Sequence, residues 1–213
     1  MRNFVHLHSS SAYSAHFGVS WPEDLAAAAA VDGDALAITD RDGLYGAVKH
    51  VKACMAAGID PIIGVDLAVL EEGPHGLYAS GRVVVLAHGG AAVAPGTGYA
   101  ALCRLISLAH AGSATVGVTL EQLAAGVLDP ISGTPALTVL LGPMSPVGRA
   151  MGGNQQYLLP RRKFRAWHRA MPAGSFVVEL VNHQSSQGTA MSMSYAVRLL
   201  KLRGLRQIGR AHV

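Results

Sequence analysis

Imidazole and carboxylate side chains gather along several strand-like segments of the chain. His6 and His8 are two residues apart near the N-terminus, and residues two apart on a strand point to the same face. Asp40 follows one apolar run, and Asp66 lies within the next. Imidazole and carboxylate together suit Zn²⁺, Mn²⁺ or Fe²⁺, and such a metal generates hydroxide that attacks a phosphoester. The pattern therefore indicates a candidate metal site.

The elements that must position these residues alternate along the chain. Apolar runs predict strands, and 3.6-residue periodicity or end signals predict helices. The expected strands are 4–8, 35–39, 62–70, 83–87, 137–141 and 176–181, and the expected helices are 20–30, 44–57, 99–110, 119–125, 159–170 and 190–202. Repeated strand–helix units favour an α/β fold with a mostly parallel sheet, and the pattern alone leaves an open sheet and a closed barrel equally possible.

Composition limits the classes of protein to which the chain can belong. Its 213 residues suit one domain, and half of them are hydrophobic while 14% are charged. No apolar run reaches membrane-spanning length without interruption, and no secretory leader precedes the first strand. Cys54 and Cys103 lack CxxC spacing and are expected to be thiols. We therefore expect a soluble, cytoplasmic protein with no membrane partner.

A basic cluster stands apart from the metal-like residues. It comprises Arg161, Arg162, Lys163, Arg165 and Arg169. A solvated helix face is the simpler interpretation, and contact with phosphate groups is the alternative.

Three segments resemble the PHP (polymerase and histidinol phosphatase) domain, and most closely the one at the N-terminus of DnaE-type bacterial DNA polymerase III alpha subunits. They are Phe4-Val5-His6-Leu7-His8, the run from Ala35 to Ala47, and Pro61-Ile62-Ile63-Gly64-Val65-Asp66. Residues 98–105 also resemble the family's Gly-Tyr-x-x-Leu-Cys-Arg-Leu helix. The resemblance implies a distorted (β/α)7 barrel, incomplete at its C-terminus.

The resemblance also implies a set of metal-ligand positions, several of which are retained. The family motif His-Leu-His-x-His-Ser-x-Tyr-Ser is aligned by Tyr13-Ser14, so that His8 matches one ligand. An alternative alignment keeps His6 and His8 together as the ligand pair. The positions that still carry ligand-like side chains are His6, His8, Asp40, Asp66 and His183, and Glu179 is assigned to possible charge compensation with Arg41.

Three positions depart from the family pattern. Ser10 stands in the place of a histidine, Phe17 in the place of an acid, and Arg41 in the place of the histidine of Thr-Asp-His. A guanidinium presents no lone pair and brings a fixed positive charge. We therefore expect a vestigial metal site, with no catalytic residue in this chain. Arg41 is expected to pair with Asp40, Asp66 or Glu179 and so compensate their charge.

The resemblance implies a function for the parent protein. The chain is interpreted as the PHP part of a DNA-directed DNA polymerase, a nucleotidyltransferase of replication or repair synthesis that uses Mg²⁺. Its partners would be the remaining polymerase domains, and DNA through the parent, while this part binds no cofactor and is inactive alone. The alternative is a stand-alone PHP phosphoesterase or 3′–5′ exonuclease that binds Zn²⁺ or Mn²⁺.

The last residues lack periodicity. The codons ATC GGA AGA GCA CAC GTC encode residues 208–213 and spell a common sequencing-library adapter, and CAG for Gln207 extends the match. We therefore expect residues 1–206 to be a partial PHP domain and residues 207–213 to be a non-native tail that packs against nothing. A natural basic tail is the alternative.

Overall fold

The computed structural model describes residues 4–112, 115–152, 158–181 and 207–211 of the chain. Its strands are β1 (Phe4–His6), β2 (Gly33–Ile38), β3 (Asp60–Gly73), β4 (Gly76–Ala87), β5 (Val118–Thr119), β6 (Leu137–Leu141), β7 (Phe176–Val181) and β8 (Gln207–Ala211). Its helices are α1 (Pro22–Ala29), α2 (Ala47–Ala57), the 3₁₀ turn η1 (Gly90–Ala92), α3 (Thr97–Ala111), α4 (Leu120–Gly126), α5 (Pro146–Gly152) and α6 (Leu158–Ala170). The predicted helix 190–202 lies outside the described residues.

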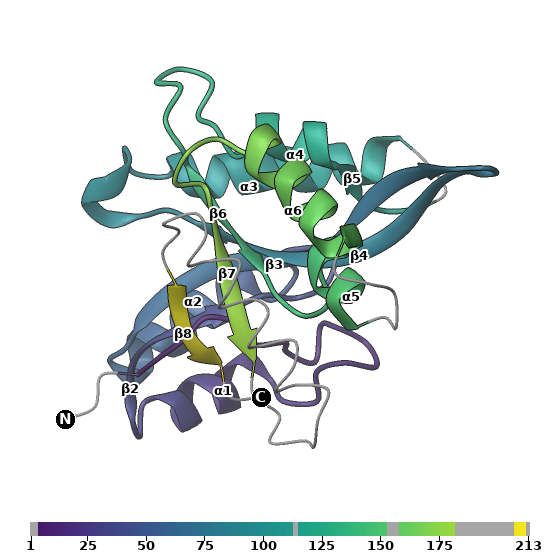
Figure 1. Cartoon of the computed structure of the whole chain (residues 1–213). Coiled ribbons are helices and arrows are strands. Elements are labelled where there is room, and N and C mark those ends of the chain that lie inside the picture. The colour runs from purple at the N-terminus through teal and green to yellow at the C-terminus, as the bar shows by residue number, and fades with distance from the viewer. Residues whose placement is uncertain (1–3, 113–114, 153–157, 182–206, 212–213) are drawn as a thin grey trace.

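One sheet runs through the molecule in the order β1-β2-β3-β4-β6-β7-β8, with β5 added beside β3. The sheet curls as half of a barrel, with α1 and α2 covering one part and α3, α4 and α6 another (Figure 1). The mixed α/β class expected from the sequence is therefore confirmed.

One strand departs from the expected parallel arrangement. β4 runs antiparallel to both β3 and β6, whereas the pairs β1–β2, β2–β3, β3–β5, β6–β7 and β7–β8 are parallel. A parallel pair needs a crossover of a dozen or more residues, but only Pro74 and His75 separate β3 from β4. The chain therefore turns back as a long hairpin, and this hairpin brings β4 side chains beside Asp66.

Local signals account for two of the helix ends. Gly58 ends α2 in the left-handed conformation, with φ of 74°, which a residue without a Cβ adopts at little cost. Thr119 and Gln122 form a capping box at the start of α4, so that each side chain satisfies a backbone amide of the other.

The hydrophobic core lies on both faces of the sheet. Val65, Leu67 and Val69 of β3 belong to the larger cluster, which α3, α4 and α6 cover. A smaller cluster on the opposite face contains Ala37, Val84, Leu86 and Leu140. Because successive strand residues alternate between faces, Asp66 faces away from the larger cluster, toward the inside of the curled sheet.

The last described residues form a strand. Residues 207–211 pair in parallel with β7, with Val178 opposite Gln207 and Val181 opposite Ala211. The expectation that this segment packs against nothing is therefore wrong for its backbone, because the free edge of β7 accepts another strand. The origin of residues 207–213 stays a prediction.

Candidate functional site

Asp40 lies two residues after the end of β2 and is only 2% exposed. Its Oδ1 atom accepts hydrogen bonds from the backbone N–H of Ser11 (2.7 Å) and from the hydroxyl of Ser14 (2.7 Å). The Ser11 hydroxyl lies 3.0 Å from Oδ1 and 2.8 Å from Oδ2. Both serines are buried on the loop that follows β1. The carboxylate therefore ties this loop to β2 and has donors at both oxygens.

Asp66 on β3 is held between two arginines. Arg41 Nε lies 3.3 Å from Asp66 Oδ2, and Arg82 Nε lies 3.0 Å from Oδ1. The Nη2 atom of Arg82 also donates to the backbone oxygen of Asp66 and to Asp42 Oδ1, each at 2.8 Å. The ion pair expected from Arg41 is thus confirmed for Asp66. Arg82, which the sequence did not suggest, makes the larger number of contacts.

Arg41 also stacks on an aromatic ring. Its Cζ atom lies 3.1 Å from the centroid of the Phe17 ring, in a cation–π arrangement. Phe17 is 57% exposed, so its ring is held at the surface rather than in the core. Two of the three positions that depart from the family pattern therefore contact each other.

His8 and Glu179 form a separate pair. His8 Nδ1 lies 2.9 Å from Oε1 of the buried Glu179 carboxylate on β7. A Cβ at position 142 would collide with Oε2 of this carboxylate, so Gly142 leaves the space that Glu179 occupies. Such a hydrogen bond also orients metal-binding imidazoles, so His8 by itself does not decide whether the site suits a metal.

Burial and neighbouring charges act in opposite directions on the pKa values of His8 and Asp66. Burial lowers the pKa of His8, but the hydrogen bond and charge of Glu179, together with Asp66, outweigh it and leave the pKa above its ordinary value. Burial raises the pKa of Asp66, although Arg82, Arg41 and His8 oppose the change. Burial and the charge of Arg82 lower the pKa of Arg41, but its guanidinium remains a cation.

The remaining predicted positions lie elsewhere or outside the description. His6 Nε2 lies 3.9 Å from Asp32 Oδ1, and its ring packs edge-on against Phe4. His6 and His8 thus have different acidic neighbours, Asp32 and Glu179. Ser10 is half-buried in the loop after β1, and His183 lies outside the described residues.

These contacts compete with a divalent cation for the carboxylate oxygens. A metal ligand uses a lone pair, and Asp66 faces guanidinium groups at both oxygens while Asp40 accepts from hydroxyl and amide donors. Across the described ranges, no three His, Cys, Asp or Glu side chains are grouped so that they could hold a metal ion.

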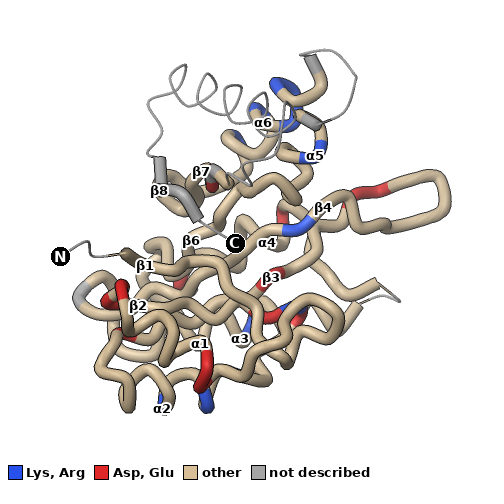
Figure 2. The backbone as a smooth tube through the Cα atoms, turned by 90° about the horizontal axis from the view of Figure 1, so that it is seen from below, with Lys and Arg blue, Asp and Glu red and all other residues tan. Residues whose placement is uncertain are grey.

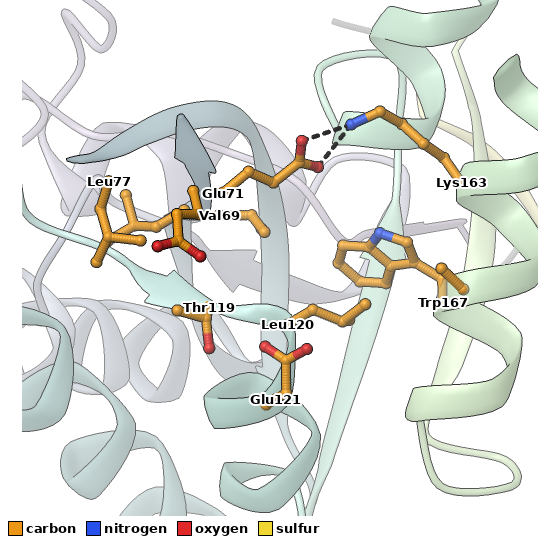
Figure 3. Close-up of a pocket in the computed structure, with 11 residues that line it drawn as sticks. Val69, Glu71, Leu77, Thr119, Leu120, Glu121, Lys163 and Trp167 are labelled. Carbon is orange, nitrogen blue, oxygen red and sulfur yellow. Dashed lines mark hydrogen bonds and ion pairs between the residues drawn. The ribbon is translucent and has the colours of Figure 1, made fainter. Parts of the chain in front are cut away.

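A pocket lies away from this group, between the β3–β4 hairpin, α4 and α6 (Figure 3). Trp167 and Leu120 form part of its wall, and Lys163 reaches across to Glu71, with Nζ 2.6 Å and 2.7 Å from the two carboxylate oxygens.

In the described part of the chain, no helix is long and apolar enough to cross a membrane.

The chain is similar to parts of bacterial DNA polymerases. It is 42% identical to the error-prone DNA polymerase of Symbiobacterium thermophilum over 111 residues, which are 52% of this chain and 9% of that protein. It is 45% identical to the DNA polymerase III subunit alpha of Buchnera aphidicola subsp. Schizaphis graminum over 73 residues, which are 34% of this chain and 6% of that protein. The matched segments thus span less than a tenth of these relatives.

Solved structures show the same fold at low identity. An amidohydrolase from Chromobacterium violaceum superposes with a TM-score of 0.56 at 15% identity, over 98% of this chain and 87% of that one. A two-domain protein from Bacteroides vulgatus, described as containing a predicted PHP-like metal-dependent phosphoesterase, gives 0.52 at 12% identity, over 97% and 50%. The family model for the PHP domain matches residues 6–183. The chain therefore belongs to the PHP domain family.

Proposed function

We propose that the chain serves as the PHP module of a DnaE-type DNA polymerase, and that its former metal site is now a structural junction. The observation that carries the proposal is Asp66 held between Arg41 and Arg82, with ion-pair distances of 3.3 and 3.0 Å. The similarity to error-prone polymerases and to polymerase III alpha subunits supports the choice of parent.

The side chains of this junction take over the role of a metal cation, because they stabilise the buried carboxylates. Buried carboxylates are costly unless they are paired and hydrogen-bonded. Two guanidinium groups neutralise the charge of Asp66, and Ser11 and Ser14 donate hydrogen bonds to Asp40. Hydrolysis in a metal-dependent phosphoesterase needs a metal-activated hydroxide. A module stabilised in this way contributes structure to the polymerase and no phosphoester hydrolysis of its own.

The parent defines the wider setting of the proposal. It would polymerise DNA from deoxynucleoside triphosphates with Mg²⁺ in the bacterial cytoplasm, through domains other than this one. The PHP module would pack against those domains and contact DNA as part of the same polymerase.

Metal content and hydrolytic activity test the proposal together. Purified protein, dialysed without chelator, is expected to hold well under one equivalent of Zn, Mn or Fe by mass spectrometry. With added Mn²⁺ or Zn²⁺, it should release neither phosphate from p-nitrophenyl phosphate nor nucleotides from a labelled DNA 3′ end. Stoichiometric metal with turnover that disappears in His8→Ala would overturn the proposal and favour a stand-alone phosphoesterase or exonuclease.

A further inference from the structure

Positive charge is concentrated in the C-terminal third of the chain. Residues 144–213 contain eleven of the seventeen Lys and Arg residues, but only Glu179 among the thirteen acidic residues. Such a separation of basic from acidic residues along the chain is typical of proteins that bind a polyanion. Figure 2 shows blue segments on the neighbouring helices α5 and α6, and neither helix contains an acidic residue.

Four arginines of α6 share one face of the helix. At 100° per residue, positions 161, 165, 169 and 162 fall within about 100° of arc. All four residues are exposed, whereas Phe164 and Trp167 on the opposite side are each only 2% exposed. The helix thus uses its apolar face in the core and leaves an arginine face toward solvent, formed by Arg161, Arg162, Arg165 and Arg169.

Among the described residues, the arginine face has no acidic ion-pair partner. All thirteen Asp and Glu residues lie in the described ranges, and the one acid in an ion pair with α6 is Glu71. Glu71 pairs with Lys163, which points away from the arginine face and into the pocket of Figure 3. Four neighbouring guanidinium groups repel one another, so their placement on one face is unfavourable unless an anion binds there.

We propose that the arginine face of α6 binds the phosphate backbone of a nucleic acid. The stripe from Arg161 through Arg165 to Arg169 extends about 12 Å along the helix, a length over which one DNA strand presents three to four phosphates. Arginine presents a planar fork of donors that matches phosphate oxygens. A membrane surface fits less well, because the apolar face needed to enter a bilayer is already buried in the core. The inference is independent of the proposed loss of metal.

Salt-dependent DNA binding by the full chain tests the inference. Fluorescence anisotropy with a labelled DNA duplex measures the slope of log Kobs against log salt, which is about −0.9 for each phosphate neutralised. Four contacts predict a slope near −3.6, so affinity falls about 150-fold between 50 and 200 mM salt. The variant Arg161→Gln/Arg165→Gln should lose two contacts, which reduces the slope to about −1.8 and the fall to about 12-fold.

A matched variant separates the arginine face from overall charge. Lys52→Gln/Arg104→Gln removes the same charge from exposed positions of α2 and α3 and should leave the slope near its original value. Unchanged melting temperatures would show that all variants fold. An unaltered slope in Arg161→Gln/Arg165→Gln, or equal losses in both variants, would overturn the inference. Displacement of DNA by poly-glutamate at equal charge concentration would overturn it as well, in favour of an acidic protein partner.

Discussion

Replacing Arg82 with methionine should destabilise the fold more than any other single change at the junction. The methionine keeps part of the aliphatic stem but removes donors to Asp66 Oδ1, Asp66 O and Asp42 Oδ1, at 3.0, 2.8 and 2.8 Å. Asp66 is 8% exposed and, among the described residues, would keep Arg41 as its remaining ion-pair partner. Removing one partner of a buried pair costs about 3–5 kcal/mol, and partial exposure of the Arg82 side chain (18%) reduces this to about 3–4 kcal/mol.

The matched substitution Arg41→Met provides the comparison. Arg41 makes one ion pair at 3.3 Å with a side chain 27% exposed, so its loss should cost about 1–2 kcal/mol. Urea unfolding followed by circular dichroism gives both values, provided that the m-value is unchanged. For a chain of this length, Arg82→Met should lower the melting temperature by about 6–16 °C.

A second substitution tests the cause of the loss. In Arg82→Met/Asp66→Asn, the buried Asp66 charge is removed and only the more exposed Asp42 loses its ion pair, so part of the lost stability should return. An Arg82→Met cost equal to or below that of Arg41→Met, or a double variant no more stable than Arg82→Met, would refute the reasoning.

Three further predictions follow from the same group. Arg41→His alone should not produce stoichiometric metal binding by mass spectrometry, because Phe17 still supplies no ligand atom. His8 has a raised pKa, so its pair with Glu179 stabilises the fold fully below about pH 6.5 and loses this effect as pH rises through the raised pKa. The free energy of unfolding should therefore fall from pH 6 to pH 9 by more in the wild type than in His8→Gln. Gly142→Ala should displace the Glu179 carboxylate and lower the stability by about 1–3 kcal/mol. If this loss disappears in Gly142→Ala/Glu179→Gln, the charge of the carboxylate is its cause. If the loss remains, its cause is steric.

Strand positions could be predicted where apolar runs are uninterrupted. The strands 137–141 and 176–181 have the predicted bounds, because their β-branched and apolar residues are flanked by turn residues. The β3–β4 hairpin was missed, because two apolar runs in succession give no sign of their relative direction. The sequence pattern is the same for a parallel pair and for a hairpin.

The candidate site was predictable only in part for the same reason. Asp40 and Asp66 could be placed together because both belong to neighbouring parallel strands, and the backbone N–H of Asp66 donates to the Asp40 carbonyl at 3.0 Å. Arg82 reaches Asp66 only through the antiparallel register, in which it lies opposite Ala68. Ser11 and Ser14 lie on an irregular loop, whose side-chain directions follow no period. Their positions beside Asp40 thus depend on tertiary contacts.

The dependence of thermal stability on metal tests the central claim most directly. A cation that binds the native state at one hundred times its Kd adds about 2.7 kcal/mol, which raises the melting temperature of a chain of this length by about 5–11 °C. If Asp40 and Asp66 are held by serine and arginine donors, the melting temperature should be the same in EDTA, Mn²⁺ and Zn²⁺. A saturable increase of that size with either metal, lost in Asp40→Asn, would contradict the account.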